Sequence, residues 1–418
     1  MSLPNPAKLP SQLCLTGPAD LPFADLPSPA ELVDLRYLRA NLEYLADLGQ
    51  AAGVTVLLAQ KAYSLYQTYP LISQYLAGSC ASGLYEARLA HEEMPGKALQ
   101  VFSPAYQAGE LQEVLTYADH VIFNSPSEWQ RWRQQALAAQ ANRPAEAPLA
   151  LGLRLNPEYA EIEEDIYNPA APGSRLGTTR QELDRALAQD PDFLKGLTGF
   201  HIHALCEQGA ESLAGVLAAV EAHFAPFLTL PHISWLNLGG GHHFTRRDYN
   251  VALFVELMQN WRGKYAVEIC VEPGEAVALD CGWLVSRVLD TPSNGLRLAI
   301  LDTSASCHMP DVLEMPYRPR CFRVRPDGSH EPEAEASPYL YRLGGPTCLA
   351  GDIIGDYRFA SPLQRGDLLV FGDMSIYSHV KRNSFNGMPL PDLYSWDGRD
   401  LVCLRHFSYK DFKTKLGS

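Results

Sequence analysis

Several residues that could do chemistry stand at the ends of short apolar runs in this sequence. Lys61 follows the run VTVLLAQ, and the amine of a lysine there would be partly desolvated. Desolvation favours the neutral amine, which is the form that makes a Schiff base with a carbonyl group. The alternative is a lysine that reaches solvent past the strand end.

A glycine triplet and a glutamate extend this pattern. Gly239, Gly240 and Gly241 let the backbone approach an anion such as a phosphate and offer N–H groups to it. Glu272 precedes a Pro-Gly turn, where its carboxylate could keep a pyridine nitrogen protonated so that the ring accepts electrons. The alternatives are an ordinary glycine-rich turn and a surface glutamate.

The segment His201-Ile202-His203 places two imidazoles on the same face of a strand. One interpretation is a pair of metal ligands, as in barrel hydrolases. Another is one histidine packed flat on a cofactor ring beside a structural neighbour. A third is a core histidine with its hydrogen bonds satisfied.

A second group of candidates lies nearer the C-terminus. The segment Gly344-Gly345-Pro346-Thr347-Cys348 precedes Gly351-Asp352, and Gly372 to Tyr377 reads GDMSIY. Cys348 could be a buried structural thiol, or a proton donor because it follows a Gly-Pro turn in a loop.

Eight near-continuous apolar runs separated by helical segments must position the first group. Such runs are typical of parallel strands buried on both faces, and eight of them predict a closed (β/α)8 barrel with its active site at the C-terminal strand ends. An open doubly wound sheet is the alternative. The predicted strands are 54–60, 79–82, 99–103, 120–124, 151–156 (with Arg154), 197–203, 235–240 and 266–273.

The pattern differs at the two ends of the chain. From Asp34, leucines at spacings of three and four predict a helix that Gly49 and Gly53 end. Past about residue 285, β-like runs broken by Pro and Gly predict a mostly antiparallel β-sandwich or β-barrel domain. We therefore expect a barrel over 34–285 and a β domain over 286–418, with a contribution from 1–33.

The bulk composition limits partners and location. Of 418 residues, 46% are hydrophobic and 20% charged, and the formal net charge is −14. That charge argues against nucleic acid or an anionic membrane as a general partner and is compatible with a cationic substrate. No apolar run approaches the ~20 residues that span a bilayer, and no signal peptide is evident, so we expect a cytoplasmic protein. Nine scattered cysteines without a CxxC pair predict neither a disulfide framework nor a structural zinc site.

Taken in order, the motifs resemble those of the fold-type III pyridoxal-phosphate (PLP) enzymes, the group of alanine racemase, diaminopimelate decarboxylase and ornithine decarboxylase. The resemblance runs from about residue 30 to the end. Within the group, the chain is most similar to the carboxynorspermidine/carboxyspermidine decarboxylases. The segments that carry this are 199–207, 236–245, 271–277, 301–319, 344–352 and 380–387.

The resemblance implies PLP as cofactor and a role for each motif. Lys61 would hold PLP as a Schiff base, His203 would stack on its ring, Glu272 would pair with its pyridine nitrogen, and Arg154 would lie in the cofactor site. Gly239 to Gly241 and Tyr377 would bind its phosphate. Cys348 would enter the partner subunit's site of a homodimer and protonate the carbanion after CO2 leaves, while Glu275 and Asp311 would bind ammonium groups of the substrate.

Two departures narrow the activity that the resemblance implies. Ornithine and diaminopimelate decarboxylases carry arginine where this chain has Glu275, and an acidic residue where it has Leu349; Asp352 or Asp311 could replace that acid. We therefore expect decarboxylation of carboxynorspermidine or carboxyspermidine to norspermidine or spermidine. The alternatives are a diaminopimelate or other basic amino-acid decarboxylase, a barrel metallohydrolase that uses His201 and His203, and a non-catalytic PLP-binding protein.

Overall fold

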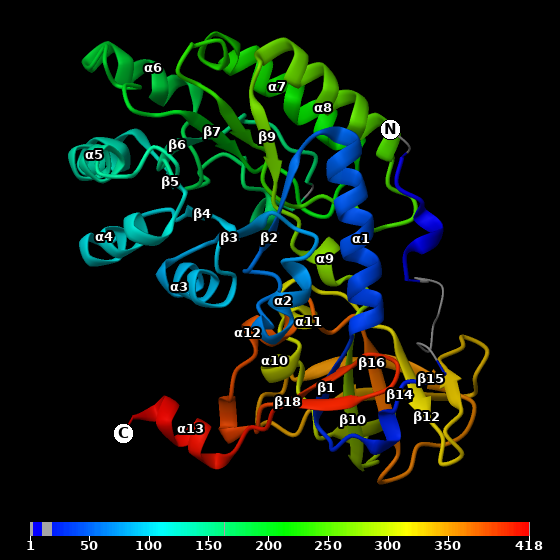
Figure 1. Cartoon of the computed structure of the whole chain (residues 1–418). Helices are drawn as coiled ribbons and strands as arrows, with labels where there is room; N and C mark the ends of the chain where they lie inside the picture. Colours follow the sequence, from blue (N-terminus) through cyan, green and yellow to red (C-terminus); the bar gives the residue numbers. More distant parts are fainter. Residues whose placement is uncertain (1–2, 11–18, 163, 418) are drawn as a thin grey trace. The chain divides into compact units, whose positions relative to one another are not determined.

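The computed structural model describes residues 3–10, 19–162 and 164–417. These residues form two compact units (Figure 1). The barrel unit comprises residues 42–277 together with the N-terminal residues up to Leu9. The sheet unit comprises residues 10–41 and 278–418.

The barrel unit contains a closed barrel of eight parallel strands, as the apolar runs predict. The open-sheet alternative is wrong, because the last strand of the series pairs with the first. The strands are β2 (Thr55–Ala59), β3 (Gly78–Ala81), β4 (Ala98–Phe102), β5 (His120–Phe123), β6 (Ala150–Leu155), β7 (Gly199–Ile202), β8 (Trp235–Asn237) and β9 (Glu268–Val271).

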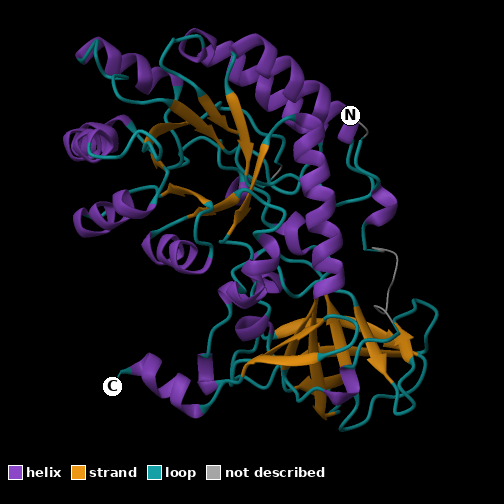
Figure 2. Ribbon diagram, viewed as in Figure 1, coloured by secondary structure: helices purple, strands orange, loops and turns teal. Residues whose placement is uncertain are grey.

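Helices surround these strands (Figure 2). The predicted leucine-rich helix is α1 (Leu35–Ala52), which continues through Gly49 and ends at Gly53, where φ is +67°. Its predicted end at Gly49 is therefore wrong, because a glycine inside a helix weakens it without breaking it. The other helices are α2 (Tyr69–Ile72), α3 (Leu84–Glu93), α4 (Ala108–Tyr117), α5 (Pro126–Ala141), α6 (Arg180–Gln189), α7 (Ala210–Leu228), α8 (Val251–Tyr265) and α9 (Glu275–Ala278).

The sheet unit is mainly antiparallel, as predicted; β1–β17 and β11–β14 are its parallel pairs. Its central order is β13-β12-β16-β10-β1-β17-β18, with β11, β14 and β15 continuing from β10. The strands are β1 (Ala30–Asp34), β10 (Gly282–Asp290), β11 (Arg297–Leu301), β12 (Cys321–Val324), β13 (His330–Pro332), β14 (Tyr339–Gly344), β15 (Ile353–Phe359), β16 (Leu368–Gly372), β17 (Asp392–Trp396) and β18 (Leu401–Arg405).

The sheet is covered on both faces near its centre. Leu284 and Phe371 belong to one buried cluster, whereas Trp283 and Val370 belong to another. Alternate residues of a strand point to opposite faces, so β10 and β16 are apolar along both. Short helices lie between the strands, namely α10 (Ala305–His308), α11 (Asp311–Glu314) and α12 (Ser378–Lys381), and α13 (Tyr409–Leu416) follows the last strand.

The predicted boundary between residues 285 and 286 falls inside β10. The domain ranges 34–285 and 286–418, with a contribution from 1–33, stay a prediction. All eight described cysteines are free, and Cys14 lies outside the described residues. Among the described helices, none is both long and apolar enough to cross a membrane.

Candidate active site

Lys61 follows β2 in a turn, two residues past the last strand residue, and its side chain is exposed. The expectation of a partly desolvated amine is therefore wrong for this chain, because the backbone has left the strand before the lysine. The positive charge of Lys61 still acts on the site. It counts among the causes that lower the pKa of His203, and it opposes the rise in the pKa of Glu272. The barrel thus brings Lys61, His203 and Glu272 to one place.

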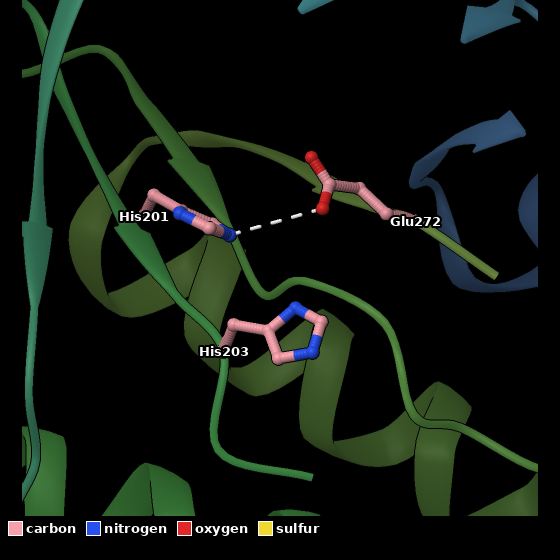
Figure 3. Close-up of side chains that lie close together, drawn as sticks. All are labelled: His201, His203 and Glu272. Atoms are coloured by element: carbon pink, nitrogen blue, oxygen red, sulfur yellow. Dashed lines mark ion pairs between the residues drawn. The ribbon is translucent and has the colours of Figure 1, made fainter. Parts of the chain in front are cut away.

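Glu272 is buried at the end of β9, with 6% of its surface exposed, so the surface-glutamate alternative is wrong. Its Oε1 accepts a hydrogen bond of 2.6 Å from Asn237 Nδ2, and its Oε2 lies 3.8 Å from His201 Nε2 (Figure 3). Burial raises the pKa of Glu272, while the Asn237 hydrogen bond and the charge of Lys61 oppose that rise. A carboxyl group with a raised pKa is suited to sharing a proton with a basic nitrogen.

The two predicted histidines differ in their surroundings. His201 is almost fully buried inside the barrel, where burial and the charges of Arg154 and Lys61 hold its pKa well below the usual value. His203 lies just past β7, and its Nδ1 accepts from the N–H of Gly240 at 3.1 Å. A neutral His203 therefore carries its proton on Nε2. Donor atoms of both histidines and Glu272 lie within 4.8 Å of one another, so the geometry alone would also suit a metal.

The glycine triplet bends sharply after β8. Gly239 and Gly241 have φ of +68° and +82°, and a Cβ on Gly241 would stand 2.1 Å from the carbonyl oxygen of Leu205. The N–H of Gly239 donates to Asn237 Oδ1 at 2.7 Å, while that of Gly240 donates to His203. Two of the three N–H groups expected to face an anion therefore hold site side chains in this structure.

Arg154 points into the barrel from β6 with 4% of its surface exposed. Its Nη2 donates to the carbonyl oxygen of His203 at 3.0 Å, and its guanidinium lies 4.6 Å from the ring centre of Phe102. Burial lowers the pKa of Arg154 to about 10, against the opposing charge of Glu272. This buried cation fixes the backbone at the end of β7.

Asn237 and Gln100 complete the site and were missed by sequence reasoning. Asn237 Nδ2 donates to Gln100 Oε1 at 2.6 Å as well as to Glu272. Both amides are buried, in strands that are otherwise apolar. A polar side chain inside an apolar strand needs a partner, and that was the signal that could have identified them.

An acidic rim surrounds His243. Its Nδ1 lies 3.8 Å from Glu275 Oε1, at the start of α9, and its Nε2 lies 3.9 Å from Glu207 Oε2. Burial lowers the pKa of His243 to about 4, so the imidazole is neutral near pH 7. The two carboxylates therefore set the charge of this rim, which suits a cationic ligand.

The sheet unit holds the remaining predicted residues. Cys348 is exposed in the loop between β14 and β15. Asp311, the first residue of α11, forms an ion pair with Lys381. Asp352 is 4% exposed and accepts hydrogen bonds from its own unit, and its contact with a substrate amine stays a prediction.

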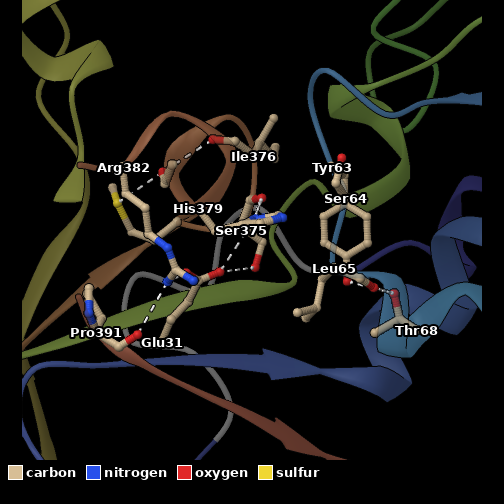
Figure 4. Close-up of polar contacts among 12 residues, drawn as sticks. Glu31, Tyr63, Ser64, Leu65, Thr68, Ser375, Ile376, His379, Arg382 and Pro391 are labelled. Atoms are coloured by element: carbon tan, nitrogen blue, oxygen red, sulfur yellow. Dashed lines mark hydrogen bonds and ion pairs between the residues drawn. The ribbon is translucent and has the colours of Figure 1, made fainter. Parts of the chain in front are cut away.

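Tyr377 precedes α12 with φ of +56°, in a segment anchored to β1 by Glu31 (Figure 4). Glu31 Oε1 lies 3.7 Å from His379 Nδ1, and its Oε2 lies 3.6 Å from Arg382 Nη1. Burial raises the pKa of Glu31 to about 7, although the charge of Arg382 opposes the rise. The backbone around Tyr377 is thus held by a buried polar network.

Comparison with known proteins decides which chemistry this geometry serves. Residues 40–375 match the family described as "Pyridoxal-dependent decarboxylase, C-terminal sheet domain". The chain belongs to the pyridoxal-dependent decarboxylases. It is therefore a decarboxylase with PLP as cofactor, and the metallohydrolase and non-catalytic alternatives are wrong.

Several members of this family resemble the chain over nearly its whole length. It is 36% identical over 398 residues to the carboxynorspermidine/carboxyspermidine decarboxylase of Campylobacter jejuni, which covers 94% of this chain and 99% of that enzyme. It is 39% identical over 400 residues to the carboxyaminopropylagmatine decarboxylase of Synechocystis, over 94% and 97% of the two chains. The crystal structure of the Campylobacter jejuni carboxynorspermidine decarboxylase with norspermidine superimposes with a TM-score of 0.80 at 34% identity, covering 93% of this chain and 100% of that one.

The barrel residues fit PLP on structural grounds. Glu272 is a buried carboxyl group, the kind of partner that a protonated pyridine nitrogen takes. Side chains are excluded at the glycine triplet, where a Cβ on Gly240 would stand 2.5 Å from the carbonyl oxygen of Glu272. Lys61, the lysine whose charge acts on both Glu272 and His203, completes the set.

Proposed function

We propose that this decarboxylase acts on a carboxylated polyamine, with carboxynorspermidine and carboxyspermidine as its substrates and norspermidine and spermidine as the products. The observation that carries the proposal is the 36% identity over 94% of the chain to an enzyme of that name. The acidic rim formed by Glu207 and Glu275 suits such cationic substrates. Diaminopimelate decarboxylases are more distant, with 26% identity over 262 residues for that of Deinococcus radiodurans.

A second substrate of the same class is carboxyaminopropylagmatine. The 39% identity to the Synechocystis enzyme favours it as strongly as the first pair. This substrate ends in a guanidinium group, whereas the first two end in a primary ammonium group. Carboxylates accept both cations, but a planar guanidinium favours two parallel hydrogen bonds.

In this proposal the barrel residues hold the cofactor and direct its electrons. When bound, PLP supplies the electron sink that makes loss of CO2 from the substrate possible. Lys61 would hold the cofactor through its amine. Glu272 would keep the pyridine nitrogen protonated, and His203 would support the ring.

The remaining roles concern phosphate, substrate and proton transfer. Gly239 to Gly241 and Tyr377 bind the phosphate, while Arg154 supports the cofactor site through the backbone of His203. Glu275 and Asp311 bind ammonium groups of the substrate. Cys348 gives a proton to the α-carbon after CO2 has left.

We also propose that the enzyme is a cytoplasmic homodimer in which Cys348 serves the partner subunit's site. The exposed position of Cys348 supports a role outside its own unit. The eight cysteines that the structure describes are all free, which supports a reducing compartment, because disulfides persist mainly in oxidising ones.

Release of CO2 from four compounds tests the substrate assignment: carboxynorspermidine, carboxyspermidine, carboxyaminopropylagmatine and diaminopimelate. We expect kcat/KM to be highest for one of the three carboxylated polyamines. The first two differ by one methylene, which is usually worth only ~1–3 kcal/mol in a pocket. Turnover of diaminopimelate with none of the polyamines would contradict the proposal.

Replacing Lys61 tests the site itself. Lys61→Ala should abolish both the visible absorbance of the bound cofactor and turnover. Lys97→Ala is the matched control, because Lys97 is a barrel lysine whose Nζ donates to the carbonyl oxygen of Leu76. A fully active Lys61→Ala protein would show that another residue attaches the cofactor.

A further inference from the structure

We propose that Asp352 is a positioning residue that holds the loop bearing Cys348, so that the thiol delivers its proton to the α-carbon of the substrate. The inference rests on the proposed role of Cys348. It replaces the expectation that Asp352 binds the substrate.

The carboxylate of Asp352 ties its own loop to a second segment of the sheet unit. Oδ2 accepts a hydrogen bond of 2.7 Å from Thr347 Oγ1, the residue directly before Cys348. Oδ1 accepts from Ser304 Oγ at 3.0 Å and from the N–H of Ser306 at 3.3 Å. Both oxygens are therefore engaged, in a residue with only 4% of its surface exposed. The burial of this carboxylate and its three hydrogen bonds favour a structural role for Asp352 over contact with a substrate amine.

The backbone of the loop is shaped to admit this carboxylate. A Cβ on Gly345 would stand 2.3 Å from Asp352 Oδ2, so only glycine allows the approach. The N–H of Gly345 donates to the carbonyl oxygen of Asp352 at 3.0 Å, and the N–H of Asp352 donates to that of Leu349 at 3.0 Å. Both the backbone carbonyl and the backbone N–H of Asp352 therefore hold other residues of the loop between β14 and β15.

A third segment fixes Cys348 from the other side. The N–H of Cys348 donates to Asn386 Oδ1 at 3.0 Å. Asn383 Nδ2 donates to the carbonyl oxygen of Ser306 at 2.7 Å, which joins this segment to the one that Asp352 holds. Cys348 is thus an exposed residue held at its backbone, which is the arrangement that a directional proton donor requires.

The fate of the substrate nitrogen tests the proposal. A proton delivered to the α-carbon releases the amine and restores the aldehyde form of the cofactor. A proton delivered to the cofactor carbon instead lets water release the substrate skeleton as an aldehyde, while its nitrogen remains as pyridoxamine phosphate. CO2 leaves in both cases, so the ratio of aldehyde to amine reports where the proton goes.

For Asp352→Asn we expect this ratio to rise by about tenfold or more over that of the wild-type enzyme, because a positioned proton donor contributes about 10²–10⁴-fold. Cys348→Ala should show the same pattern. The double variant should show no higher ratio than Cys348→Ala alone, because Asp352 acts through Cys348. Thr347→Val removes a single hydrogen bond to Asp352 and should give a smaller rise, so it serves if Asp352→Asn folds poorly.

Asp367→Asn is the matched control. Asp367 is another partly buried carboxylate of the sheet unit; it accepts from the N–H of Gln364 at 2.7 Å and pairs with Arg323 at 2.7 Å. The ratio of aldehyde to amine that Asp367→Asn forms should equal that of the wild-type enzyme.

Normal amine product from both Asp352→Asn and Thr347→Val would overturn the positioning role of Asp352 while leaving the role of Cys348 intact. Normal product from Cys348→Ala would overturn both roles. Absence of CO2 release from any carboxylated polyamine would instead contradict the proposed function.

Discussion

The ion pair of Asp311 with Lys381 limits how far its carboxylate is available to a substrate. As a sequence position it is a free carboxylate for an ammonium group, but in the structure Lys381 forms ion pairs with both Asp311 and Glu314. The lysine places an ammonium group where we propose that the substrate places one. Substrate binding at Asp311 must therefore compete with Lys381 or share the carboxylate with it.

Lys381→Met should lower KM for a carboxylated polyamine by roughly two- to fivefold with kcat little changed, because partly exposed ion pairs are worth about 0.2–1 kcal/mol each. The effect should shrink as salt is added, because salt screens charges at this exposure. Steady-state kinetics at two ionic strengths measure it. Lys415→Met, which removes an exposed lysine bonded to Ser384, controls for the change in net charge. An unchanged KM would show that Asp311 does not bind the substrate.

At this scale the sequence predicted residue types better than their partners. Glu272 was identified because it ends an apolar strand, and burial agrees with its expected environment. The bonds of Asp352 to Ser304 and of Lys381 to Asp311 join positions 48 and 70 residues apart. No local pattern encodes such pairings, so these partners could not be derived from spacing.

The glycine triplet is the element that orients the barrel site. It ends β8 at Asn237, three residues before the predicted end of that strand, because Gly239 takes a positive φ that no strand accommodates. Its bonds to Asn237 and His203 then fix two side chains that lie close to Glu272. The conformation of the glycine turn therefore determines how the side chains of the barrel site are oriented.

Gly241→Ala should weaken PLP binding by about tenfold or more, which corresponds to about 1.4 kcal/mol. An alanine here must adopt φ near +82°, and its Cβ would stand 2.1 Å from a backbone oxygen that cannot rotate away. Titration of the apoenzyme with PLP measures the change. Gly109→Ala, at a helical position with open space around it, should leave the affinity unchanged. Equal affinities in the two variants would argue against the loop as a phosphate site.

A second element, the segment 373–382, depends on Glu31 of β1. Because burial raises the pKa of Glu31 to about 7, the folded protein keeps this proton up to about pH 7, while the unfolded chain releases it near 4.5. The stability that the proton contributes is thus fully present below about pH 4.5 and lost as pH rises through 7.

Relative to Glu31→Gln, the free energy of unfolding of the wild-type protein should therefore fall on the order of 3 kcal/mol between pH 4.5 and 8. Urea unfolding across this range measures the difference. Glu314→Gln controls for loss of a carboxylate, because Glu314 is a glutamate of the same unit whose side chain is 58% exposed. If the free energies of unfolding of the wild-type and Glu31→Gln proteins change with pH in parallel, Glu31 does not carry this additional proton in the folded state.

For the whole molecule, the strands of the barrel unit were predicted more fully from the sequence than the strand order of the sheet unit. Parallel strands buried on both faces give unbroken apolar runs, so all eight barrel strands were predicted at their positions. In the sheet unit β1 pairs with β17, more than 350 residues later in the chain. Register over such a separation depends on tertiary packing, so the sequence predicted strands there but not their order.

The proposed dimer with shared sites predicts that two variants impaired in forming the amine product rescue each other. Lys61→Ala and Cys348→Ala subunits, mixed and exchanged, should recover about a quarter of the wild-type rate of amine formation, because half of the dimers are mixed and each of these has one intact site. Self-mixtures of each variant are the controls. Sedimentation confirms the assembly, and a mixture without recovery would show that each chain serves its own site.

The hydrogen bond between Asn386 and the backbone of Cys348 joins the proposed proton donor to a residue that is prone to deamidation during storage. Asn386 is exposed and is followed by Gly387, and an asparagine before glycine readily loses ammonia when the next backbone nitrogen attacks its side-chain amide. The product is an aspartate or an isoaspartate, which carries a negative charge and, in the second case, a longer backbone. Stored preparations will accumulate this lesion at the residue that holds Cys348, so a kinetic comparison between batches requires the mass spectrum of the peptide that contains Asn386.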